Sequence, residues 1–98
     1  MEMTEKMMTA EHILQDYLFD MSDWLNKKKT INQSNALKNK AGMLAMIEVD
    51  YQHYLVDGLD DLTQDYATAL EILKLMSEQE FTAVRQEILS WAPTKTLL

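Results

Sequence analysis

Residues 76–81 read Met-Ser-Glu-Gln-Glu-Phe, and this stretch carries the clearest helix start in the chain. Ser77 and Glu80 have the spacing of the capping box, in which each side chain accepts a hydrogen bond from the other residue's backbone N–H. Met76 and Phe81 stand at the two positions of a hydrophobic staple around that cap. The stretch therefore predicts that one helix ends near residue 76 and that the next begins at residue 78.

Apolar residues recur at helical spacing on both sides of this break. Downstream, the apolar face consists of Val84, Ile88, Leu89 and Trp91. Pro93 has no backbone N–H and stops a helix, so we predict a helix over 78–92. Upstream, we predict a helix over 60–76. Its buried side is expected to contain Leu62, Tyr66, Ala69, Leu70, Leu73 and Met76.

A first helix is predicted over 9–28. Thr9 is placed to cap it, and Leu14 and Leu18 begin a stripe of apolar residues along one face. Three lysines at 27–29 suit the negative pole at its end. We expect residues 1–8 and 93–98 to fray.

A second, long helix is predicted over 31–57, with Gly58 as the left-handed residue that ends it. Gly42 marks a kink or a close-packing point within this helix. Its buried side is expected to contain Leu37, Leu44, Ile47, Tyr51, Tyr54 and Leu55.

These segments predict an all-α fold: a small four-helix bundle-like domain over residues 1–98, with one long second helix. The unmatched length of that helix would leave an apolar flank uncovered in a monomer, around Leu37, Met43 or Leu55. Two-fold dimers are the commonest oligomers, so we expect a homodimer that buries this flank.

Composition excludes several classes of protein. The 98 residues contain no Cys, which excludes disulfide scaffolds, thiolate zinc sites and cysteine nucleophiles. The net charge of −7 argues against a general nucleic-acid coat. The longest apolar run, 41–47, is far shorter than a membrane span, and residues 1–8 lack the basic-then-apolar pattern of a signal peptide. We therefore expect a soluble cytoplasmic protein without a membrane partner.

The residues that carry chemistry do not form a recognisable catalytic set. His53 shares a helix face with Asp50 and Asp57, which would be a carboxylate–imidazole metal cluster, but a solvated histidine among surface acids is the better interpretation. The serines lack the context of a nucleophile, and two isolated glycines cannot form a phosphate loop. We predict no catalytic, cofactor-binding or metal-binding residues, and no cofactor.

Residues 35–42, Asn-Ala-Leu-Lys-Asn-Lys-Ala-Gly, resemble the H-x-L-K-G helix of histidine phosphotransfer domains, which are also small four-helix bundles. Asn35 stands in place of the phosphoryl-accepting histidine, and Asn39 in place of the family's glycine. An amide cannot serve as that nucleophile. The resemblance implies a docking module that binds a receiver-like partner without chemistry, and it covers too little of the chain for us to assign a family.

Charge divides the chain into two parts. Residues 1–49 carry six Lys and seven acids (−1), and residues 50–98 carry three bases and nine acids (−6). An acidic face near three tyrosines is typical of a surface that binds a basic protein. The predicted partner-binding residues are Tyr51, Tyr54, Asp57, Asp60, Asp61, Asp65 and Tyr66. A basic corner, the alternative site, consists of Lys27, Lys28, Lys29, Lys38 and Lys40.

The sequence thus favours a non-enzymatic acidic protein-binding module that acts by stoichiometric complex formation. An inhibitor, an immunity or antitoxin-like protein and a small secretion chaperone are the classes that fit. The eight methionines agree with this, because Met is common on adaptable binding surfaces. The alternative is a dimeric helical regulator that binds nucleic acid through the basic corner.

Overall fold

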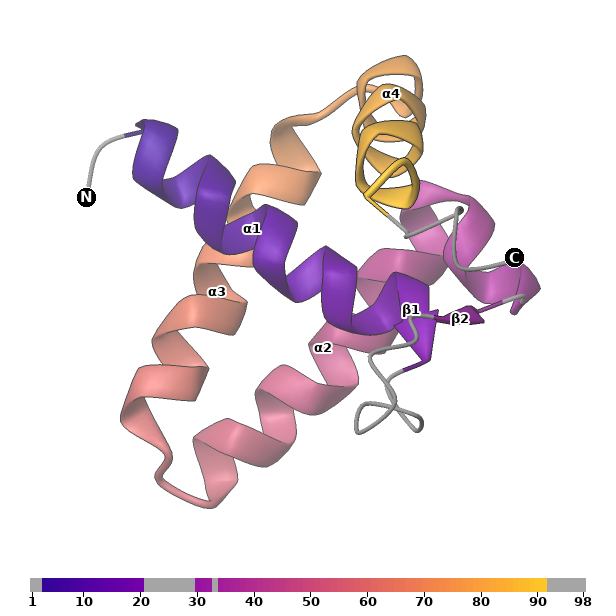
Figure 1. The fold of residues 1–98 in the computed structure, drawn as a ribbon. Coiled ribbons are helices and arrows are strands. Elements are labelled where there is room, and N and C mark those ends of the chain that lie inside the picture. The colour runs from indigo at the N-terminus through magenta and orange to yellow at the C-terminus, as the bar shows by residue number, and fades with distance from the viewer. Residues whose placement is uncertain (1–2, 21–29, 33, 92–98) are drawn as a thin grey trace.

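The computed structural model describes residues 3–20, 30–32 and 34–91, which form a mostly helical fold (Figure 1). In chain order the elements are α1 (Met3–Leu18), β1 (Phe19–Asp20), β2 (Thr30–Ile31), the 3₁₀ helix η2 (Asn35–Lys38), α2 (Lys40–Val56), α3 (Asp60–Leu75) and α4 (Glu78–Leu89). The strands pair antiparallel and have two residues each. The predicted all-α class is confirmed, with this short strand pair as an addition.

The helices are arranged around a hairpin. α2 and α3 are consecutive and pack against each other, and α1 crosses α3 and also contacts α4. In Figure 1 the turn between α2 and α3 lies at the lower edge and α4 at the upper edge. The core between them contains Ala10, Ile13, Leu14, Leu18, Phe19, Leu37, Met43, Ile47, Tyr66, Ala69, Leu70, Ile72, Leu73, Met76, Phe81 and Ile88. Burial of each large apolar side chain contributes about 1.5–3 kcal/mol.

α1 begins at Met3, well before the predicted cap at Thr9. Met7 packs against the core, and Lys6 Nζ lies 3.2 Å from Glu71 Oε1 of α3. These tertiary contacts stabilise turns of helix that no capping signal marks in the sequence. The predicted cap is therefore wrong, and so is the predicted fraying of residues 1–8 from Met3 onward.

α1 ends at Leu18, so the prediction that this helix continues to residue 28 is also wrong. Phe19 and Asp20 leave the helix as β1, with Phe19 opposite Ile31 of β2. The Asn32 N–H donates a hydrogen bond of 2.8 Å to the Leu18 carbonyl, and Phe19 is buried in the core. Strand pairing and burial of the Phe19 ring replace the next helical turn. The remainder of the predicted helix, including Lys27, Lys28 and Lys29, lies outside the described residues.

The predicted long helix over 31–57 is wrong in its first part. β2 and η2 occupy the chain up to residue 38, and Asn39 has an extended backbone (φ −137°, ψ 163°). α2 therefore begins only at Lys40 and has 17 residues, against 16 in both α1 and α3. At its other end the prediction is confirmed, because Gly58 has a left-handed φ of 73°.

Asn39 and Gly42 explain why α2 begins where it does. Asn39 Oδ1 accepts a hydrogen bond of 2.8 Å from the Gly42 N–H, which makes it the N-cap. A Cβ atom on Gly42 would lie only 1.8 Å from the Ala36 carbonyl oxygen. Arg85 Nε donates 3.1 Å to the Leu37 carbonyl and so ties η2 to α4. Gly42 is thus a close-packing point in the first turn of α2.

The apolar flank expected of a long second helix is mostly covered. Leu37 and Met43 are fully buried, and only Leu55 is exposed. The expected dimer therefore no longer has an uncovered flank at Leu37 and Met43 to support it.

α3 and the start of α4 agree with the sequence prediction. Ser77 Oγ accepts from the Glu80 N–H at 3.1 Å, and Glu80 Oε1 accepts from the Ser77 N–H at 3.0 Å, so the predicted capping box is confirmed. α4 ends at Leu89 rather than at the predicted residue 92. There the Ser90 hydroxyl donates to the Glu87 carbonyl at 2.5 Å, which is a contact that competes with continuation of the helix.

Candidate functional site

The predicted acidic surface lies at the turn between α2 and α3, at the lower edge of Figure 1. Gly58 ends α2, and the Leu59 N–H donates 3.0 Å to the Tyr54 carbonyl, so the chain reverses within a few residues. The four predicted aspartates, Asp57, Asp60, Asp61 and Asp65, are all exposed. Asp60 and Asp61 occupy the first turn of α3, where carboxylates interact favourably with the positive pole of the helix.

Exposed apolar side chains lie among these acids. Val56 is 82% exposed, and Leu55, Leu59 and Leu62 are 50%, 44% and 41% exposed. The helical spacing assigns Leu55 and Leu62 to buried faces, and that assignment is wrong because the hairpin extends beyond α1 at this end (Figure 1).

We call residues 55–62 the acidic tip. An open hollow of about 450 Å³ lies in it, lined by residues 58–62. The tip therefore presents carboxylates and apolar side chains together on one projecting turn.

The predicted tyrosine anchors belong to the interior more than to the surface. Tyr66 is only 8% exposed and is part of the core. Its ring packs edge-on against Tyr54, with centroids 4.9 Å apart, and against Tyr17 at 6.4 Å. Tyr51 and Tyr54 are half-buried and pack on the same core. These rings join α1, α2 and α3.

A polar contact continues this aromatic cluster. The Tyr17 hydroxyl donates to Asp50 Oδ2 and so links α1 to α2. Burial, followed by this hydrogen bond, raises the pKa of Tyr17 well above its usual range. Burial also raises the pKa of Tyr66 to about 12, with its hydrogen bond to Tyr54 as the next cause. The surroundings of both phenols therefore favour the neutral form further.

The histidine cluster considered from the sequence is not assembled. Asp50 accepts a hydrogen bond from the Tyr17 hydroxyl, whereas His53 and Asp57 are exposed. Within residues 3–20, 30–32 and 34–91, no three His, Cys, Asp or Glu side chains are placed to hold a metal ion.

The two lysines of the basic corner that the structure describes, Lys38 and Lys40, differ in their contacts. Lys38 is exposed, whereas Lys40 Nζ donates 2.5 Å to the Met76 carbonyl. Lys40 thus holds the start of α2 against the end of α3. Nothing in the spacing of the lysines indicates this role, because it depends on how the helices pack.

A cleft between α1 and α3 is a feature that the sequence analysis missed. It has a volume of about 280 Å³ and is lined by Thr9, His12, Ile13, Asp16, Leu62, Asp65 and Tyr66. Burial raises the pKa of Asp16, and the nearby His12 opposes this by lowering it. The residues are separated by about fifty positions in the sequence, so only the crossing of the two helices reveals the cleft.

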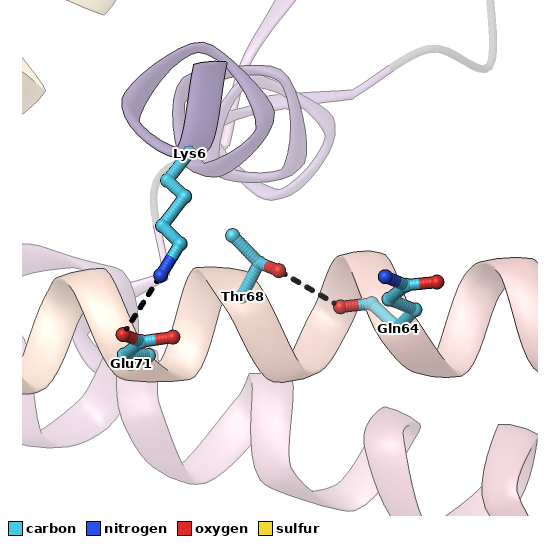
Figure 2. A network of polar contacts seen from close by, with 4 residues as sticks. All are labelled: Lys6, Gln64, Thr68 and Glu71. Atoms are coloured by element: carbon cyan, nitrogen blue, oxygen red, sulfur yellow. Dashed lines mark hydrogen bonds and ion pairs between the residues drawn. The ribbon is translucent and has the colours of Figure 1, made fainter. Parts of the chain in front are cut away.

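The same pair of helices is joined further along by an ion pair that Figure 2 shows. Lys6 reaches from α1 to Glu71 on α3, and the two charged atoms are 3.2 Å apart. Beside this ion pair, and within α3, the buried Thr68 donates its hydroxyl hydrogen to the Gln64 carbonyl at 3.0 Å. This contact satisfies a polar group that would otherwise be costly to bury.

The segment that resembles a phosphotransfer helix has a different structure. Residues 35–38 form the 3₁₀ helix η2, and the extended backbone of Asn39 separates η2 from α2.

Comparison with protein-family models, with curated proteins and with solved structures finds no match to this chain. In the part of the chain that the structure describes, no helix has the length and apolarity to cross a bilayer.

Proposed function

We propose that this chain is a non-enzymatic protein-binding module that forms a stoichiometric complex with a basic protein through its acidic tip. The observation that supports this most directly is the 82% exposure of Val56 beside the exposed Asp57, Asp60 and Asp61. An inhibitor, an immunity or antitoxin-like protein and a small secretion chaperone all act by this kind of complex formation.

The apolar part of the tip supplies a reason to associate. Val56, Leu55, Leu59 and Leu62 all retain 41% or more of their exposure in the free chain. Removing such surface from water contributes roughly 25 cal/mol per Å² of apolar area. Exposed apolar groups rimmed by polar residues are a common mark of protein interaction sites. The energy of binding would thus come from these side chains.

The charged part of the tip selects the partner. Residues 50–65 contain five Asp and no Lys or Arg, so nothing within this stretch neutralises the carboxylates. An unbalanced field of this kind raises the association rate with a positively charged surface and repels acidic ones. The partner is therefore a basic protein.

A matched pair of charge reversals tests the tip. Asp60 and Glu78 are each the first residue of a helix, both are exposed, and both change by two charge units on substitution by Lys. The partner is first identified by mass spectrometry of material that co-purifies with a tagged copy. We expect Asp60→Lys to slow association several-fold and to flatten its salt dependence, with Glu78→Lys close to wild type.

The apolar residues are tested by Val56→Ser, which changes an exposed side chain that the fold does not need. Truncation of a central anchor costs about 2 kcal/mol and acts on the dissociation rate, so the complex should dissociate roughly thirtyfold faster. The proposal fails if Asp60→Lys and Val56→Ser leave the kinetics unchanged. It also fails if nucleic acid co-purifies with the tagged copy instead of a basic protein, and if mutation of Lys38 releases that nucleic acid.

The bundle-like packing and the homodimer stay predictions. A second copy would now have to bury the exposed side chains of Met46 and Val49 on the outer side of α2, which are uncharged and do not repel each other as two acidic tips would. Light scattering should then give twice the chain mass of 11.4 kDa, and a value of one chain mass at high concentration would refute the dimer.

A further inference from the structure

The cleft between α1 and α3 brings together two carboxylates from different helices. Asp16 projects from α1 and Asp65 from α3, and both line the cleft. Tyr66 lies in the lining of the same cleft, beside these two aspartates. His12 and Thr9 complete the polar lining.

Apolar side chains form the rest of the wall. Ile13 is buried in the core, and Leu62 is half covered. A volume of about 280 Å³ is at the lower limit of the 300–1,000 Å³ typical of pockets for drug-sized ligands. The cleft therefore suits one long side chain with an aliphatic stem and a positively charged head.

We infer that this cleft binds an arginine side chain of the basic partner, with the guanidinium between Asp16 and Asp65 and the aliphatic stem along Ile13 and Leu62. The inference rests on the proposed function and adds the residue type that the partner inserts. Arginine fits better than lysine because its planar group offers five N–H donors that can be shared between two carboxylates. Leu62 belongs both to the cleft and to the acidic tip, so one partner can occupy both.

Asp16 is exposed as a residue, but its carboxylate is partly desolvated, and this supplies a physical reason for the choice. Because that carboxylate is partly removed from water, burial raises its pKa and disfavours its charge. A cation placed against it restores the lost stabilisation of the charged form. The imidazole of His12 does this only in part.

The cleft is tested without the partner, by NMR titration of the whole chain with N-acetyl-arginine N-methylamide. We expect saturable chemical-shift changes at Thr9, His12 and Ile13. These changes should be smaller with the lysine analogue and absent with the neutral citrulline analogue. Asp16→Asn should weaken binding about tenfold, which corresponds to about 1.4 kcal/mol, because the guanidinium then faces one carboxylate instead of two. Glu87→Gln, the same change at an exposed position on α4, should leave binding unchanged.

A second variant guards against a purely structural effect. Asp65→Asn alters an exposed carboxylate and should weaken arginine binding in the same way as Asp16→Asn. Equal shifts with the citrulline analogue, or wild-type affinity in both variants, would overturn the inference.

The two proposals fail separately. If Asp60→Lys slows partner association but Asp16→Asn leaves the complex unaltered, the cleft is wrong and the proposed function stands. If the arginine analogue binds the cleft but no basic protein forms a complex, the cleft stands and the proposed function is wrong.

Discussion

Replacing Gly42 by alanine is the sharpest test of the fold, because sequence and structure predict opposite signs. Alanine is favoured over glycine in a helix by about 1 kcal/mol, so helix propensity alone predicts a more stable protein. In the structure, however, the added Cβ would lie 1.8 Å from the Ala36 carbonyl oxygen and 2.7 Å from its carbonyl carbon.

The size of the effect follows from this geometry. Cβ atoms essentially never approach other heavy atoms within 3.0 Å, so η2 and α2 must separate by at least 3.0 − 1.8 = 1.2 Å. Overpacking costs about 1–3 kcal/mol, and the upper value applies because the obstructing atoms belong to the backbone. After subtraction of the propensity gain, Gly42→Ala should destabilise the protein by about 2 kcal/mol. The separation also strains the hydrogen bonds that the Gly42 N–H donates to Asn39 Oδ1 and that Arg85 Nε donates to the Leu37 carbonyl.

Urea denaturation and thermal unfolding measure this change directly. A loss of about 2 kcal/mol corresponds to a fall in Tm of roughly 8–16 °C for a domain of this size. Ala45→Gly, at an exposed position of α2, measures the propensity term alone and should cost about 1 kcal/mol. A Gly42→Ala protein as stable as the wild type, or more stable, would refute the close approach of η2 to α2.

Three further substitutions test the other contacts. Ser77→Ala should lower the free energy of unfolding by about 1 kcal/mol through loss of the cap, and unchanged urea denaturation would refute the capping box. Tyr17→Phe removes the hydrogen bond to Asp50 and should cost about 1 kcal/mol, whereas Tyr51→Phe should cost little in the same assay. The raised pKa of Tyr66 stabilises the folded state fully below its ordinary value of 10.0, and this stability is lost as the pH rises through about 12. Thermal unfolding at alkaline pH should show that loss, Tyr66→Phe should reduce it, and an identical pH profile in that variant would contradict the assignment.

Local signals predicted part of the fold because they depend on near neighbours. The capping box at Ser77 and Glu80 and the left-handed Gly58 act within a few residues of the chain, and both are present as expected. The segment from Thr30 to Asn39 was mispredicted because its structure depends on distant residues. β2 pairs with β1, and η2 is held by Arg85 of α4.

The candidate site divides in the same way. The exposure of Asp57, Asp60 and Asp61 follows from their charge and is recognisable in the sequence. The burial of Tyr66 and the exposure of Leu62 are not, because both residues have the spacing of a buried helix face. Which of them is covered is decided by where α1 crosses the hairpin (Figure 1).

Site-specific crosslinking from the acidic tip tests the proposed function most directly. A photoreactive residue at Val56, in a tagged copy expressed in the native cells, should crosslink one basic protein at one-to-one stoichiometry. The same residue at Glu87 on α4 should not crosslink it, and Asp60→Lys should reduce the yield from position 56. Equal crosslinking from both positions, or an acidic product at position 56, would contradict the proposal that the acidic tip binds a basic partner.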